Sequence, residues 1–159
     1  KIKIPTDLSD ITIRQYVQFL NETENQTDHE KAVTMVSIFC NLTREQVNQL
    51  PASDFDMILD EMNKILESEP KHERIIIHKG VQLGFVPNLD ECTLGEIIAM
   101  DELIQDIKSW GEAMSVFYRP ITKKINDHYD IEPYKPNKIT DLSDLPLSVA
   151  LGVQVFFTI

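Results

Sequence analysis

The last fifteen residues are the most apolar segment of this chain and constrain its fold more than any other feature. Residues 145–159, LPLSVALGVQVFFTI, contain no Asp, Glu, Lys or Arg. A chain terminus is ordinarily polar and mobile, so an apolar one is expected to be buried in its own domain or against a partner. The segment is shorter than the roughly 20 residues that cross a bilayer. We therefore predict a core or docking helix. Its predicted partner-binding residues are Val149, Val153, Phe156, Phe157 and Ile159.

Length and charge limit the kind of protein. With 159 residues and 42% hydrophobic content, a single domain spanning 1–159 is expected, large enough to bury a core. The formal net charge is −11 and the pI is about 4.7. Nucleic acids and anionic membranes both bind basic faces. The expected partner is therefore a protein, either a different one or further copies of this chain, so that oligomerisation is one outcome.

Hydrophobic periodicity and capping residues predict a mainly helical α+β fold. Thr12, Thr43 and Thr93 each stand three residues before Gln or Glu, which is the capping-box pattern. Ser53 is a further candidate N-cap. The predicted helices cover about 12–20, 28–40, 43–50, 54–67, 93–106 and 109–118, and a last one begins near 144–146. The predicted strands are a short one at 1–5, an apolar hairpin at about 74–87 and a minor, polar hairpin at about 121–131.

One pentapeptide occurs twice. Thr-Asp-Leu-Ser-Asp stands at 6–10 and again at 140–144, and each copy precedes a predicted helix. Ser and Asp are favoured at helix entries, so the simpler interpretation is one entry device used twice. A duplicated domain would require similarity beyond these five residues, and none is visible.

An acidic stretch and one arginine are the polar candidates for a binding site. Residues 80–107 contain no Lys or Arg but six acids, which can form a solvated helix face, face a basic partner or bind a cation. Glu96 fits the third position of the Thr93 capping box, which leaves Asp101 and Glu102 as candidate partner contacts. Arg119 follows the aromatic residues 117 and 118. It is expected either to anchor a backbone carbonyl or a carboxylate, or to bind the partner.

Signatures of catalysis are missing from the sequence. The four histidines have no i, i+4 spacing, and no His-Glu-x-x-His, Cys-x-x-Cys, Gly-x-Ser-x-Gly or phosphate-binding glycine loop occurs. We therefore predict no catalytic residue, no metal ligand and no cofactor, and a protein that is not an enzyme. A reactive residue with a strongly perturbed pKa inside a pocket would reverse this expectation.

Three stretches in a fixed order carry a family resemblance. They are Gly80–Asp90 (GVQLGFVPNLD), Met114–Ile121 (MSVFYRPI) and Leu145–Gly152 (LPLSVALG). The chain resembles a group of small proteins of tailed bacteriophages, especially those of Bacteroides-type hosts and crAss-like relatives. Such proteins tend to be encoded among virion-assembly genes, and some are labelled tail assembly chaperones.

The resemblance implies a non-enzymatic role in tail assembly. In the chaperone version, the protein covers apolar segments of a long tail protein in the host cytoplasm. In the first alternative it is a structural component of the virion, a ring, connector or shell subunit that packs against its own copies. In the further alternative it is an adaptor or inhibitor of a host protein.

Overall fold

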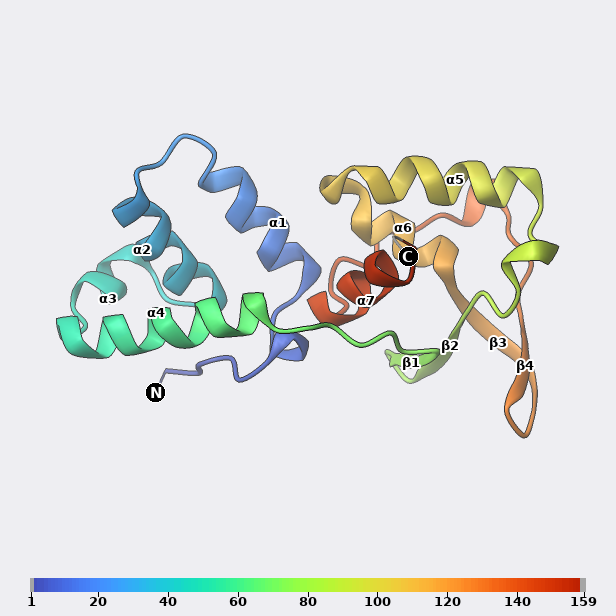
Figure 1. Cartoon of the computed structure of the whole chain (residues 1–159), viewed down its shortest axis with the longest axis horizontal. Coiled ribbons are helices and arrows are strands. Elements are labelled where there is room, and N and C mark those ends of the chain that lie inside the picture. Colours follow the sequence, from blue (N-terminus) through green and yellow to red (C-terminus); the bar gives the residue numbers. More distant parts are fainter. Residues whose placement is uncertain (1, 158–159) are drawn as a thin grey trace. The chain divides into compact units, whose positions relative to one another are not determined.

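The structure, a computed structural model of the whole chain, describes the backbone of residues 2–157 and the side chains of residues 2–156. This part of the chain contains seven α-helices and one four-stranded antiparallel sheet (Figure 1). The predicted fold class, a mainly helical α+β protein with an apolar and a minor hairpin, is confirmed. The predicted contact Ile159 and the side chain of Phe157 lie outside the described residues.

The chain, expected to form one domain over 1–159, divides into two compact units. The first, here the helical unit, comprises Lys1–Pro70 and Pro146–Ser148. The second, here the sheet unit, comprises Lys71–Leu145 and Val149–Ile159. That the two units make a single domain remains a prediction.

Threonine caps begin most helices of the helical unit. The unit contains α1 (Ile13–Glu22), α2 (Asp28–Phe39), α3 (Arg44–Asn48) and α4 (Ala52–Glu67). The predicted boxes at Thr12 and Thr43 are confirmed, and Thr27 forms a third one before α2. In each box, the threonine hydroxyl accepts a hydrogen bond from the third backbone N–H of the helix, and the Gln or Glu there bonds back.

Apolar side chains from all of these elements form the core of the helical unit. The ring centroids of Phe19 and Phe39 lie 5.5 Å apart between α1 and α2. Ile11 and Ile13 flank the Thr12 cap and are buried, as is Met62 of α4. Within this unit the Ile11 carbonyl accepts a hydrogen bond from the N–H of Leu147 at 2.7 Å, which joins residues 146–148 to the start of α1.

Two local predictions in this unit are wrong. Ser53 is not an N-cap, because α4 already begins at Ala52 behind Pro51, whose carbonyl accepts the first helical bond from Phe55 at 3.0 Å. Residues 2–5 form no strand. Alternation of polar and apolar residues is insufficient there, since a strand also needs a neighbouring strand to satisfy its backbone.

The two predicted hairpins combine into one sheet in the sheet unit. The strands are β1 (Ile75–His78), β2 (Val81–Phe85), β3 (Tyr118–Ile125) and β4 (His128–Ile131), in the order β1-β2-β3-β4. Lys79 and Gly80 have φ of 51° and 79°, the pair of positive values that a two-residue type I′ turn requires. β2 and β3 pair with Phe85 opposite Tyr118, and the β3–β4 hairpin extends away from the helices of the unit (Figure 1).

Helices α5 (Leu94–Gln105), α6 (Trp110–Phe117) and α7 (Leu147–Phe157) supply the remaining core of the sheet unit. The predicted capping box at Thr93 is confirmed. Trp110 is buried and donates its indole N–H to the Ile104 carbonyl at 3.0 Å. The rings of Phe85 and Phe117 stack at 5.8 Å, and α6 leads into β3 without a loop, so the aromatic residues at 117 and 118 lie in the core.

Candidate functional site

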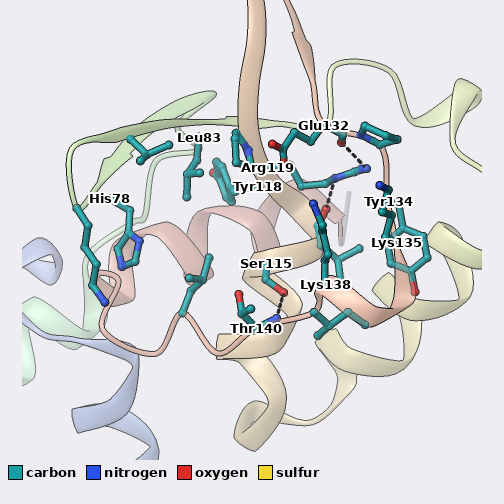
Figure 2. A pocket seen from close by; sticks show the side chains of 17 residues that line it. His78, Leu83, Ser115, Tyr118, Arg119, Glu132, Tyr134, Lys135, Lys138 and Thr140 are labelled. Carbon is teal, nitrogen blue, oxygen red and sulfur yellow. Dashed lines mark hydrogen bonds between the residues drawn. The ribbon is translucent and has the colours of Figure 1, made fainter.

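A pocket of about 370 Å³ lies in the sheet unit between the sheet, the end of α6 and residues 132–142 (Figure 2). Its volume is within the range of small ligand sites and side-chain anchoring pockets. Val81, Leu83, Val116, Tyr118, Pro120 and Leu142 make up most of its apolar lining. We call it the basic pocket, because Lys79, Lys135 and Lys138 also line it.

A glycine on α6 lets one wall of the basic pocket form. Gly111 accepts a backbone hydrogen bond from Leu142 at 3.0 Å. A Cβ atom at Gly111 would overlap the side chains of Asp141 and Ser143. The second copy of the pentapeptide can therefore pack against α6 because residue 111 has no side chain. Beside it, the Thr140 N–H donates to Ser115 Oγ at 3.1 Å, as Figure 2 shows. Residues 140–142 are thereby fixed as a wall.

Positive charge is concentrated in the basic pocket although the chain is acidic. Four of the 15 Lys and Arg residues line it, and only one of the 26 Asp and Glu residues does. These residues are Lys79, Arg119, Lys135 and Lys138 on the basic side, and Glu132 on the acidic side. Within residues 2–157 no ion pair is formed by Lys135 or Lys138. Their charges are therefore available to a ligand.

Arg119 is a structural element of the pocket wall. It is 8% exposed and donates three hydrogen bonds: from Nε to the Val116 carbonyl at 3.1 Å, from Nη1 to the Glu132 carbonyl at 3.1 Å, and from Nη2 to Glu96 Oε2 at 2.6 Å. The anchoring role predicted for Arg119 is confirmed for both kinds of acceptor. These bonds use three of the five guanidinium N–H groups, and direct partner binding by Arg119 remains a prediction.

Glu96 joins α5 to this wall. One carboxylate oxygen closes the capping box on the Thr93 N–H at 3.0 Å, and the other accepts the Arg119 bond. Burial alone raises the pKa of Glu96, but the hydrogen bonds from Thr93 and Arg119 outweigh burial and keep the pKa below its usual value. Glu96 is therefore charged at neutral pH and anchors α5.

The turn of the first hairpin is tied to the pentapeptide wall by an acid. The two carboxylate oxygens of Asp144 each lie 3.1 Å from His78 Nε2, and Lys79 Nζ lies 3.8 Å from Oδ2. The His78 hydrogen bond and the nearby charges lower the pKa of Asp144. In Figure 2, His78 lies at one end of the basic pocket and Lys135 and Lys138 at the other; Lys79, next to His78, also lines the pocket.

The predicted docking face of α7 is largely internal. Val149 and Val153 are buried, and a Cβ at Gly152 of α7 would come within 2.6 Å of the Lys71 carbonyl. These two valines are corrected from partner contacts to core residues, because this face of α7 packs inside the protein. Phe156 is 43% exposed, and its ring stacks on His72 with centroids 4.7 Å apart.

Asp101 and Glu102 are exposed on α5, as their role as candidate contacts requires. The residues that sequence reasoning missed are the pocket lysines Lys79, Lys135 and Lys138. Lys79, in the hairpin turn, is 56 or more positions from Lys135 and Lys138, which follow β4, and no spacing rule connects such distant positions. Only the local density of lysine at 135–138 could have drawn attention to them.

Comparison of the chain with protein-family models, with curated proteins and with solved structures finds no match. Over the described residues, none of the helices combines the length and apolar character needed to cross a bilayer.

Proposed function

We propose that this chain is a non-enzymatic binding protein that acts through protein contacts in bacteriophage tail assembly, in the manner of a chaperone. The observation that carries the proposal is the basic pocket, an apolar recess flanked by lysines on an otherwise acidic chain. Its partner is a protein segment with apolar side chains and neighbouring carboxylates.

Each part of the pocket has a separate task in such binding. Burial of a partner's apolar side chains against Val81, Leu83 and Leu142 contributes about 25 cal/mol per Å². Exposed charge pairs at the rim add only about 0–1 kcal/mol each. Their main effect is on the encounter rate and on the choice of partner. The acidic remainder of the surface repels acidic segments everywhere else, so the lysines direct them to one place.

The phage setting rests on the resemblance. Two of the three stretches that carry it also build the pocket: Gly80–Asp90 contributes Val81 and Leu83, and Met114–Ile121 contributes Arg119 and Pro120. The residues that resemble the phage proteins are thus in part the residues that shape the site, which favours a shared binding role.

Peptide binding tests the proposed function. A fluorescent peptide of alternating leucine and glutamate should bind more tightly than the same peptide with lysine in place of glutamate. Lys135→Glu/Lys138→Glu should reverse this preference, whereas Lys123→Glu/Lys124→Glu, on exposed β3 positions outside the pocket, should leave it unchanged. Equal affinity of the wild-type protein for the two peptides would contradict the pocket's role.

The setting is tested in a phage that encodes the chain. Deletion of the gene should leave filled heads without tails in electron micrographs. Normal tails after deletion would refute a role in tail assembly while leaving the binding function of the pocket intact.

A further inference from the structure

We propose that the segment bound in the basic pocket is the outward face of α5 from a second copy of this chain, so that copies join head to tail. This inference rests on the proposed function of the pocket and names its partner. Both surfaces belong to the sheet unit, so each molecule carries a complete docking helix and a complete pocket.

The outward face of α5 carries an unusual apolar patch. Leu94, Ile97 and Ile98 are 75%, 40% and 47% exposed. Their spacing of i, i+3 and i+4 places them side by side on one face of the helix. Large apolar side chains that are exposed singly are common, but a contiguous group on one helix marks an interaction site. The opposite face of α5 is already used, since Glu96 and Met100 are buried.

Acidic side chains flank this patch at both ends. Asp90 and Glu91 precede α5, Asp101 and Glu102 follow Ile98 by about one turn, and all four are exposed. Over the seven residues from Leu94 to Asp101 a helix rises about 10 Å. The α5 face is therefore an apolar centre between two acidic ends.

The basic pocket also has an apolar centre, and its unpaired lysines stand at one end. Its apolar lining lies between His78 at one end and Lys135 and Lys138 at the other (Figure 2). Lys79, next to His78 in the turn, also lines it. Apolar centre meets apolar centre, and acids beside the α5 patch meet Lys135 and Lys138, which form no ion pair among the described residues. This is the complementarity that selects partners at protein interfaces.

The docking helix is held rigid before it binds. The Thr93 capping box fixes its first turn, and the buried Glu96–Arg119 ion pair fastens that turn to the pocket wall. A helix that is already ordered loses little conformational entropy on docking. Because the donor face and the acceptor pocket are different surfaces, the contact is heterologous and generates a ring or an open filament.

Two variants, each defective in one surface, test the contact by light scattering after size exclusion. Ile98→Arg places a cation on the helix where the pocket is basic, and Lys135→Glu/Lys138→Glu makes the pocket repel the acids of α5. Wild-type protein should grow beyond a monomer as its concentration rises. Each variant should weaken self-association about tenfold or more. Met57→Arg, at an exposed apolar position on α4, is the matched control and should behave as wild type.

Mixing the two variants gives the decisive measurement. The pocket of Ile98→Arg and the helix of Lys135→Glu/Lys138→Glu are both intact, so the mixture should form a one-to-one dimer that cannot grow. A wild-type monomer at every concentration would overturn the inference, and so would a mixture that stays monomeric. If acidic leucine peptides still bind the pocket in that case, the proposed function stands and the partner is another protein. If these peptides do not bind the pocket either, both the proposed function and the self-association are refuted.

Discussion

Arg119 Nη2 lies 2.6 Å from Glu96 Oε2, and both side chains are almost fully buried. This ion pair connects three elements whose order in the sequence gives no hint of their contact. Glu96 is in the first turn of α5, and Arg119 is the second residue of β3. The Arg119 guanidinium also donates a hydrogen bond to the carbonyl of Glu132, the residue after β4. A buried pair of this kind adds little net stability when intact, but it is costly to break.

Arg119→Met should therefore lower the free energy of unfolding by about 3–5 kcal/mol, because it leaves the Glu96 carboxylate buried without its partner. Urea denaturation measures the loss. The double variant Arg119→Met/Glu96→Gln should recover most of it, since no unpaired charge remains. Lys64→Met, which breaks the exposed pair with Glu61, is the control and should cost less than about 1 kcal/mol. Equal effects of the two single substitutions would refute the buried pair's role.

Substitution of Gly111 should loosen the wall of the basic pocket. In Gly111→Ala the new methyl group overlaps Asp141 and Ser143, so we expect a destabilisation of about 1–3 kcal/mol and weaker peptide binding. Gly95→Ala is the matched control on α5, because the nearest atom to its Cβ is 3.7 Å away. That change should be neutral or should stabilise by up to about 1 kcal/mol. A thermally unchanged Gly111→Ala variant would disprove the close approach.

Stability should decrease in mildly acidic solution because of His72. Burial among aromatic rings, assisted by the positive charge of Arg74, lowers the pKa of His72 from its ordinary value of 6.5. The unfolded chain therefore takes up the proton first, and stability that is present above about pH 6.5 is lost as the pH falls below it. The urea midpoint should fall more steeply between pH 7 and pH 5 in wild type than in His72→Phe. Parallel curves would show that His72 does not titrate in this way.

Val153→Ala should behave as a core substitution. Val153 is fully buried, and loss of its methyl groups should cost about 1–3 kcal/mol. Binding of the acidic peptide at a temperature where the variant is folded should be unchanged. Val155→Ala, at a position 45% exposed on the same helix, should stay within about 0.5 kcal/mol of wild type. A variant at 153 that is stable but deficient in binding would restore the docking interpretation of α7.

Local signals in the sequence predicted the secondary structure well, and the site poorly. Thr12, Thr43 and Thr93 act within a single turn of the helix that they begin, and Lys79-Gly80 forms a turn from its own backbone preferences, so these features were visible as patterns. The pairing of β2 with β3, and the placement of Lys79, Lys135 and Lys138 around one pocket, depend on packing between segments that are distant in the sequence. Hydrophobicity identified α7 as a buried element, but it could not say that the protein's own core would cover Val149 and Val153.

The two copies of the pentapeptide show which contacts the local sequence determines and which ones depend on the tertiary structure. In both copies the first aspartate accepts a hydrogen bond from the serine two residues later, at 2.7 Å for Asp7 and 3.0 Å for Asp141. The sequence by itself determined this turn, because the partners are joined by so short a piece of chain that bringing them together costs little entropy.

The last aspartate of each copy has a role that only the tertiary structure decided. Asp10 turns back onto its own copy and accepts hydrogen bonds from Thr6 N at 2.9 Å and from its hydroxyl at 2.8 Å. Asp144, in the same five residues, binds His78 from 66 positions away instead, while the Thr140 N–H bonds to Ser115. Identical sequences hold equal local preferences, so the difference arises from which side chains the surrounding fold brings within hydrogen-bonding distance.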